Sequence, residues 1–165
     1  KTELLIQMDG LSKRKGQVFV LAASNLPWDL DQAMLRRLEK RILVGLPDTE
    51  SRKYIMRKLL SHDEYSSLTD TDFECLAQAT ENYSGADLSL VCKESAMKKL
   101  RQVMTQIAIM ERDSDVDINP SQLLQQNKIT LHDVQNALSS TRPSGGMYRV
   151  RYEEWQTKYG SDGAQ

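Results

Sequence analysis

Two adjacent arginines, Arg36 and Arg37, are the residues whose type and spacing most suggest chemistry in this sequence. They stand between a short helical segment at residues 31–35 and an apolar run at residues 42–44. A planar guanidinium matches the negative charge that spreads over the γ-phosphate oxygens during phosphoryl transfer. Taken alone, such a pair is more often part of a solvated surface. The pair therefore indicates either a surface patch or arginine fingers that reach a nucleotide held by a neighbouring subunit.

A second candidate, Asn25, follows the apolar run at residues 18–23. Open α/β folds bind their ligands beyond the carboxyl ends of buried strands. There an amide can accept a hydrogen bond from a water molecule and donate one to a phosphate oxygen. Asparagine is also common in ordinary turns, and Leu26-Pro27 follows directly. Position alone favours a turn residue over one that orients water.

Other parts of a nucleotide-hydrolysing site are missing from the sequence. It contains no G-x-x-x-x-G-K-[ST] loop, whose backbone amides and lysine grip phosphates. No apolar strand ends in Asp-Glu, so carboxylates that hold magnesium and activate water would lie outside this chain. We therefore expect the chain to be inactive by itself.

The elements that would position these residues change character at Pro47. Residues 18–23 and 42–44 are short apolar runs bounded by turn residues, which is typical of strands buried on both faces of a parallel sheet. The sequence after Pro47 has helical periodicity instead. We expect an α/β remnant over residues 1–47, an all-α subdomain over 48–147, and a C-terminal aromatic helix and tail over 148–165.

Helix starts in the second part are marked by a hydroxyl residue followed three positions later by an acid, the spacing of a capping box. The pairs are Thr71 with Glu74, Ser84 with Asp87, and Thr130 with Asp133. An apolar stripe follows each start: Phe73, Leu76, Ala77; Leu88, Val91, Cys92, Ala96, Leu100, Val103, Met104, Ile107; and Leu131, Val134, Leu138. We expect these residues to form the core, with Cys92 as a packed thiol. Residues 113–128 lack a period and predict a loop.

The last element carries four aromatic residues at steps of four, three and four, which places them on one face of a helix. They are Tyr148, Tyr152, Trp155 and Tyr159. Such a stripe is far more often a packing surface than a cofactor site, because aromatic side chains bury large areas. We expect this helix to dock onto another part of the protein.

Composition places the 165 residues among ordinary globular chains, with 39% hydrophobic and 27% charged residues. A net charge of −1 argues against a dominant nucleic-acid surface. The two cysteines form neither a disulfide framework nor a zinc pair, which fits a cytosolic or nuclear compartment. No apolar run is long enough for a membrane span. Because the sequence opens at Lys1 inside a helical pattern, we expect a fragment of a longer protein.

In order and spacing, these residues resemble the AAA ATPases of the meiotic clade, and within it the katanin catalytic subunit family. The resemblance covers nearly the whole chain and is carried by residues 18–42, Leu46-Pro47, Tyr83-Ser84-Gly85-Ala86-Asp87-Leu88 and Tyr152-Glu153-Glu154-Trp155. The Thr141-Arg142-Pro143-Ser144 stretch is more similar to the second katanin-like paralogue than to katanin itself.

The resemblance implies a role for each matching residue before Pro47. Asn25 would be the sensor-1 residue, on the γ-phosphate side. Arg36 and Arg37 would be paired arginine fingers that act on the ATP of the adjacent protomer. Leu35 replaces an arginine that is commoner in the family, so a third arginine is missing.

After Pro47 the resemblance implies that Gly85, Ala86 and Asp87 begin the lid helix that borders the adenine. The clade lacks a sensor-2 arginine there. Asn82 stands where relatives often carry glycine, which departs from the pattern of the adenine loop.

The function that the resemblance implies is microtubule severing. A ring hexamer would hydrolyse ATP, with its Mg²⁺ ligands outside this chain, and thread the acidic C-terminal tails of tubulin through its pore. This would occur in the cytoplasm on microtubules or the spindle, and a further partner could be a regulatory subunit.

Two alternatives stay open. Disassembly ATPases of the Vps4 type share the clade, but they carry a β-rich insertion where residues 113–128 lie, and this stretch lacks strand periodicity. The second alternative is a non-catalytic helical interaction module that resembles the ATPases only because it shares their ancestry.

Other candidate sites are weaker. Residues 113–117 imitate the opening of a calcium loop, but Ile118 and Leu124 occupy the positions that require glycine and glutamate. His62 and His132 lack neighbouring ligands, so no metal site is predicted. The Lys-Lys-Leu-Arg run at residues 98–101 indicates a solvated helix face, or less often a contact with an acidic surface such as a tubulin tail.

Overall fold

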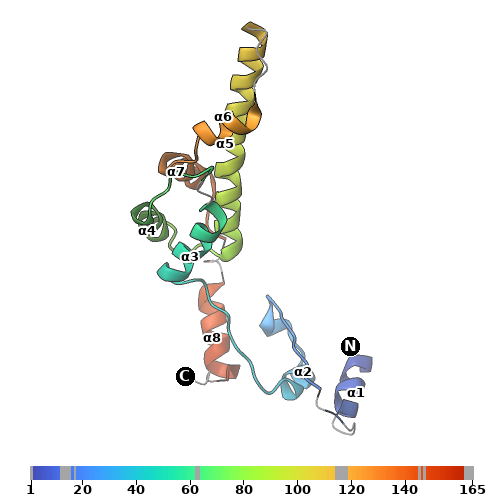
Figure 1. Cartoon of the computed structure of the whole chain (residues 1–165). Coiled ribbons are helices and arrows are strands. Elements are labelled where there is room, and N and C mark those ends of the chain that lie inside the picture. The colour runs from blue at the N-terminus through green and yellow to red at the C-terminus, as the bar shows by residue number, and fades with distance from the viewer. Residues whose placement is uncertain are drawn as a thin grey trace. The chain divides into compact units, whose positions relative to one another are not determined.

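A computed structural model describes residues 2–11, 16, 18–61, 64–113, 119–144, 146 and 148–161. The chain divides into two compact units, one formed by Lys1–Val44 with Tyr148–Gln165 and the other by Gly45–Met147. The first unit holds α1 (Thr2–Leu11), the 3-10 turn η1 (Pro27–Asp29), α2 (Gln32–Arg37) and α8 (Arg149–Tyr159). The second holds α3 (Thr49–Leu60), α4 (Asp70–Ala79), α5 (Gly85–Asp113), α6 (Pro120–Gln126) and α7 (Leu131–Ser140) (Figure 1).

The helical unit is built on an apolar core that the sequence pattern predicts. Met56, Leu76, Leu88, Val91 and Val134 are fully buried where α3 and α7 pack on α5 and α4 packs on α3. The prediction for the core face of α5 holds as far as Val103 and Ile107, which are buried, whereas Met104 between them is 53% exposed.

Helix starts in this unit follow the predicted chemistry, with one correction. The Ser84 and Asp87 pair caps α5 as predicted, since Ser84 N donates to Asp87 at 2.9 Å and Asp87 N donates to Ser84 Oγ at 3.2 Å. The box before α4 is not Thr71 with Glu74. Thr69 and Asp72 form it instead, because an acid at the third helical position receives the Thr69 amide at 2.8 Å.

The start of α7 has the predicted partner. The Asp133 carboxylate accepts from both the amide and the hydroxyl of Thr130, at 2.9 and 2.8 Å. Lys99 on α5 adds an ion pair to the same carboxylate at 3.2 Å. Burial alone would raise the pKa of Asp133, but the Thr130 hydrogen bonds and Lys99 outweigh it and hold the pKa below its ordinary value.

The prediction of a loop over residues 113–128 is wrong for most of the stretch that the structure describes. Residues 120–126 form α6, which begins with Pro120 at its first position, and Asn119 caps it by accepting from Ser121 N at 3.0 Å. Asn followed by Pro is a helix-start signal, and it outweighs the lack of a clear apolar period in so short a helix.

The two segments predicted as strands do not pair in a sheet within the described residues. Phe19, Leu21 and Val44 are 90%, 98% and 89% exposed, and the bridge from Ser66 to Ile129 is an isolated one in the other unit. A strand of a parallel sheet takes its hydrogen bonds from neighbours on each side. The described part of this chain supplies no such neighbouring strand, so the two apolar segments form no inter-strand hydrogen bonds there.

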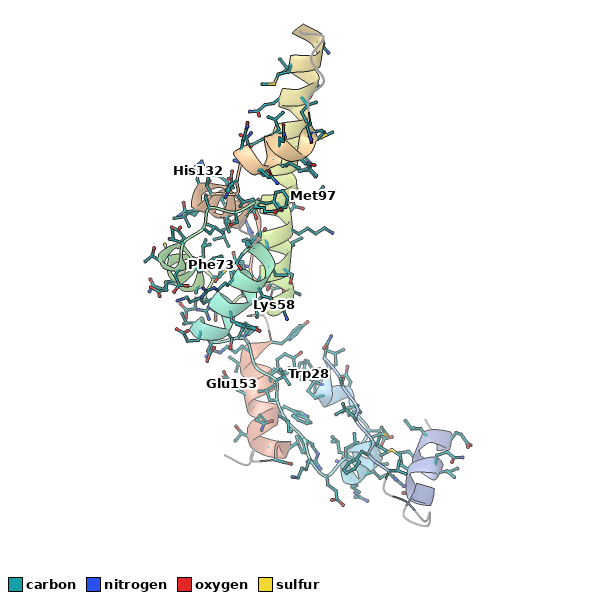
Figure 2. The ribbon with its side chains drawn as sticks, in the orientation of Figure 1. Trp28, Lys58, Phe73, Met97, His132 and Glu153 are labelled. Carbon is teal, nitrogen blue, oxygen red and sulfur yellow. The ribbon has the colours of Figure 1, made fainter. Side chains whose placement is uncertain are left out.

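The aromatic face of α8 packs as predicted. Tyr148 and Tyr152 lie against the ring of Trp28, with centroids 5.7 and 5.1 Å apart, and Trp155 contacts Tyr159 at 5.6 Å. Arg151 covers Trp28 at 4.0 Å from the ring centroid. The last helix therefore docks onto the segment around η1, where Figure 2 labels Trp28.

Among the helices of the described residues, none combines the length and the apolar character that crossing a bilayer requires.

Candidate functional site

The arginine pair belongs to the last turn of α2, not to the segment after it as the sequence suggested. Asp31 caps this helix by accepting from Ala33 N at 2.6 Å. Basic residues at a helix C-terminus interact favourably with the helix dipole, so Arg36 and Arg37 extend α2 by its last two residues.

The two arginines are not equivalent. Arg37 is half-buried and binds Asp9 of α1 through two hydrogen bonds, Nε to Oδ1 and Nη2 to Oδ2, each 2.6 Å long. Its Nη1 donates to the Ala33 carbonyl at 3.0 Å. The hydrogen bond from Arg37 lowers the pKa of Asp9, and the same contact raises the pKa of Arg37. This guanidinium is therefore committed within its own chain.

Arg36, in contrast, is exposed and forms no hydrogen bond or ion pair with the described residues. Its guanidinium keeps all its donors for an outside acceptor. Of the pair, Arg36 is the residue that is free to meet a phosphate in this conformation.

Asn25 lies two residues before η1 and is exposed. Its backbone carbonyl accepts a short hydrogen bond from the Tyr152 hydroxyl of α8. Ser24 Oγ accepts from Leu26 N at 3.1 Å and forms the turn around it. The main chain at Asn25 is thus held by α8, while the amide remains available to solvent.

The start of α5 gathers the other predicted residues. Gly85 and Ala86 are its first two residues, and a Cβ at Gly85 would meet nothing within 4 Å. Just before them, Asn82 has a φ of 67°. Asparagine tolerates this left-handed conformation better than most other side-chain-bearing residues, so Asn82 adopts it without a glycine at this position.

Asp87 has a structural task beyond the predicted Ser84 cap, because it also binds Ser144. Its carboxylate is 7% exposed and accepts from the amide and hydroxyl of Ser84 and from those of Ser144. Burial alone would raise the pKa of Asp87, but these hydrogen bonds lower it below its ordinary value. Tyr83 adds a second tie to the same stretch, since its hydroxyl donates to the Thr141 carbonyl at 2.6 Å.

The predicted residues divide between the two units. Asn25, Arg36 and Arg37 belong to the first unit, whereas Gly85, Ala86 and Asp87 belong to the second.

Sequence reasoning missed two arginines that bind main-chain carbonyls. Arg52, only 7% exposed, donates to Ala77 O at 2.8 and 3.0 Å and to Pro47 O at 2.9 Å. It precedes the buried residues Met56 and Leu60 at four-residue steps, and this register was a usable signal. Arg41 binds two helix ends, and nothing in the local pattern marks it.

Metal chemistry finds no support among the described residues, where no group of three or more His, Cys, Asp or Glu side chains could hold an ion. The calcium-like stretch lies mostly outside those residues, as does His62. His132 is exposed. Burial raises the pKa of the Cys92 thiol to about 12, as expected of a core cysteine.

Two protein-family models match the chain. One, described as "ATPase family associated with various cellular activities (AAA)", matches residues 1–46, and the other, "AAA+ lid domain", matches residues 68–116. The chain therefore belongs to the AAA ATPase family.

Proteins with similar sequences include a katanin subunit and spastin. The chain is 44% identical to the A-like 2 form of the katanin p60 ATPase-containing subunit of Xenopus tropicalis, and 38% identical to spastin of Naegleria gruberi. Each alignment covers 98% of this chain, but only 30% and 29% of the respective relative. The chain thus spans less than a third of these relatives' length.

Solved AAA structures share the fold. "Crystal structure of FIGL-1 AAA domain in complex with ADP" matches with a TM-score of 0.78 at 32% identity, covering 96% of this chain and 51% of that one. "Structural Basis for Katanin Self-Assembly" matches with a TM-score of 0.73 at 34% identity, covering 93% and 51%. The predicted fold class, an AAA α/β remnant followed by a helical lid, is confirmed at this level.

Proposed function

We propose that this chain is the C-terminal part of a microtubule-severing AAA ATPase, in which Arg36, together with Arg37 once it leaves Asp9, completes the ATP pocket of the neighbouring subunit in a hexameric ring. The observation that carries the proposal is the arginine pair at the end of α2, inside the segment that matches the AAA model. Arg36 is exposed there and has no ion-pair partner among the described residues. A guanidinium so placed is available to an acceptor outside its own chain.

The names of the relatives support the class. Katanin and spastin proteins align with nearly all of this chain, and one of the similar solved structures concerns katanin self-assembly. A self-assembling ATPase places the arginines of one subunit near the nucleotide of the next, where they stabilise the charge of the transferring phosphoryl group. Severing would locate the protein on microtubules in the cytoplasm.

The residues present fit a nucleotide in part. A Cβ at Gly85 would meet nothing within 4 Å and Ala86 is exposed next to it, so the start of α5 is accessible to a ligand. Asp87 would support this site by holding the loop, because its carboxylate is already occupied by Ser84 and Ser144. The phosphates and Mg²⁺ would be bound by residues upstream of this chain.

Asn25 fits the role of a residue that orients the attacking water. Its backbone is fixed by Tyr152 of α8, so the exposed amide would present its donor and acceptor from a defined position. Electrostatic preorganisation of this kind lowers the barrier because the group need not reorganise during the reaction.

The region between α5 and α7 favours severing over the Vps4-type alternative. Residues 119–128 of the described chain contain the helix α6 and no strand, whereas the alternative carries a β-rich insertion at this place.

The structure weakens the case for contact between residues 98–101 and acidic tubulin tails, because Lys99 already forms an ion pair with Asp133. Lys98 and Arg101 remain exposed. We therefore place the contact with the tails in the pore of the ring, outside this chain.

Steady-state ATP hydrolysis by the full-length protein tests the proposal. Arg36→Ala should lower kcat by about 10³-fold or more while leaving nucleotide affinity of the same subunit unchanged, since arginine fingers are worth roughly 10³–10⁵ in rate. Arg36→Lys should not restore the rate, because an ammonium lacks the planar fork. Lys40→Ala, a change to a neighbouring exposed cation, serves as the matched control. Normal turnover in Arg36→Ala would contradict the proposed role.

A further inference from the structure

Arg41 joins the ends of two helices through main-chain carbonyls alone. Its guanidinium donates from Nη2 to Leu35 O at 2.7 Å and from Nε to Leu38 O at 3.0 Å. From Nη1 it donates to Tyr159 O at 2.6 Å. Leu35 lies in the last turn of α2 and Leu38 is its C-cap, so these two acceptors lie on either side of the arginine pair. Tyr159 is the last residue of α8.

The chain that follows α8 adds a second set of contacts at the same place. Ser161 N donates to Arg41 O at 2.9 Å, Arg41 N donates to Ser161 Oγ at 3.1 Å, and the Ser161 hydroxyl donates to Glu39 O at 3.1 Å. These contacts bridge residues about 120 positions apart in the sequence. They fix the segment that leaves α2 against the segment that leaves α8.

Gly160 makes the approach of Ser161 possible. It caps α8, donating to Gln156 O at 2.7 Å, and a Cβ at this position would collide with the Gln156 side chain and its carbonyl. A side chain here would push the chain away from its hydrogen-bonded course.

The chemistry of Arg41 suits this place. Helix C-termini leave carbonyls without intrahelical partners and carry partial negative charge. A guanidinium presents five donors in a fixed fork, so one side chain can serve carbonyls that point from different elements. A lysine, with one compact ammonium, cannot meet all three acceptors in the same geometry. With only six residues, α2 is too short to persist without such support.

We propose that Arg41 and Ser161, here called the C-terminal clamp, are positioning residues for the arginine fingers. The clamp fixes the last turn of α2, and through it the direction in which Arg36 leaves the subunit and the backbone position of Arg37 beside it. The segment after α8 thereby controls catalysis in the neighbouring subunit without touching its nucleotide. This inference rests on the proposed function of the two arginines.

Full-length variants test the clamp through ATP turnover, nucleotide affinity and ring assembly. Arg41→Ala should lower kcat by about 10²-fold with ATP affinity unchanged, because a displacement of about 1 Å at a catalytic group costs that much. Arg41→Lys should recover only part of the loss. Ser161→Ala should lower kcat less than Arg41→Ala does, because it keeps the hydrogen bond from the backbone amide of residue 161 to Arg41 O. Lys40→Ala is the neighbouring control and should leave kcat unchanged.

A double-mutant cycle separates positioning from general destabilisation. In a background that carries Arg36→Ala and Arg37→Ala, Arg41→Ala should lower single-turnover hydrolysis no further, because it acts through side chains that are already gone. A further loss of the same factor in that background would overturn the proposal, and so would unchanged kcat in Arg41→Ala. If Arg41→Ala does not assemble, Ser161→Ala is put through the same cycle, with the same two outcomes deciding.

Failure of the clamp is distinguishable from failure of the proposed function. Unchanged turnover in the Arg36→Ala, Arg37→Ala background would refute the arginine fingers themselves. A large loss in that background together with normal turnover in Arg41→Ala and Ser161→Ala would refute only the clamp.

Discussion

Different interactions stabilise the interior of each of the two compact units of this chain. In the helical unit, side chains such as Met56 and Leu88 are fully buried, so apolar packing holds its helices. In the other unit, Phe19 and Leu21 lie exposed, and the described contacts include aromatic stacking on Trp28, hydrogen bonds to main-chain carbonyls and the ion pair of Arg37 with Asp9. Apolar packing in the helical unit is spread over many residues, whereas the polar and aromatic contacts of the other unit depend on a few.

The proposed arginine fingers and Asn25 lie in the unit with the few, directional contacts. Arg36 is exposed, Arg37 is held by Asp9, and the turn that carries both is fixed by Arg41. Regions that must move or meet a partner are drawn from the less densely packed parts of a protein. We therefore expect substitutions to affect stability mainly in the helical unit and activity mainly in the first.

The sharpest way to break this comparison uses the same substitution in both units. Leu88→Ala should lower the free energy of unfolding by about 2–5 kcal/mol, because it leaves a cavity at a fully buried position. Leu21→Ala, at a side chain that is 98% exposed, should change it by no more than about 0.5 kcal/mol. Urea unfolding of this chain followed by circular dichroism measures both. Equal costs would show that residues 18–23 are packed after all.

A second pair of variants compares two arginines of the same helix, α3. Arg52→Ala should cost about 2–3 kcal/mol, because it leaves the buried carbonyl of Ala77 without its charged donor. Arg57, 57% exposed in its ion pair with Asp70, should tolerate alanine with little change, since surface ion pairs contribute little. The same unfolding measurement applies. A cost at Arg57 as large as that at Arg52 would argue against main-chain binding as the source of stability.

The smallest effect concerns acid. The folded pKa of Asp87 lies below its ordinary value, so its contribution is fully present above the unfolded pKa of about 3.9 and is lost as the pH falls through the folded pKa. The free energy of unfolding should therefore fall below pH 4, by up to about 1.4 kcal/mol for each unit of pKa lowering. Asp87→Asn should reduce this acid dependence. Unfolding titrations from pH 6 to pH 2 that are parallel for both proteins would contradict the role of the Ser84 and Ser144 hydrogen bonds.

Periodicity and capping chemistry predicted most of the helical unit. The stripe after Ser84 gives the core face of α5, and Phe73, Leu76 and Ala77 are buried in α4 as expected. These features are local, because three- and four-residue steps determine which side chains share a face. Even the misplaced cap of α4 lies only two residues from the observed one.

Contacts between distant residues were beyond the reach of local patterns. Arg37 meets Asp9 across 28 positions, Asp87 meets Ser144 across 57, and Arg41 meets Tyr159 across 118. From the sequence alone, each of these polar side chains could equally be exposed to solvent. Only the folded chain brings it to its partner. The apolar runs at residues 18–23 and 42–44 show the reverse case, since a strand pattern needs neighbouring strands to become a sheet.

Mixed rings test the central claim most directly. Full-length protein that carries Arg36→Ala and Arg37→Ala would be titrated into protein whose phosphate-binding loop is inactivated, and ATP turnover of the mixture would be measured. If the arginines act across the junction between subunits, some junctions combine an intact phosphate site with intact arginines, and the mixture regains turnover that each parent lacks. A mixture as inactive as its parents at every ratio, with ring assembly verified, would contradict the account.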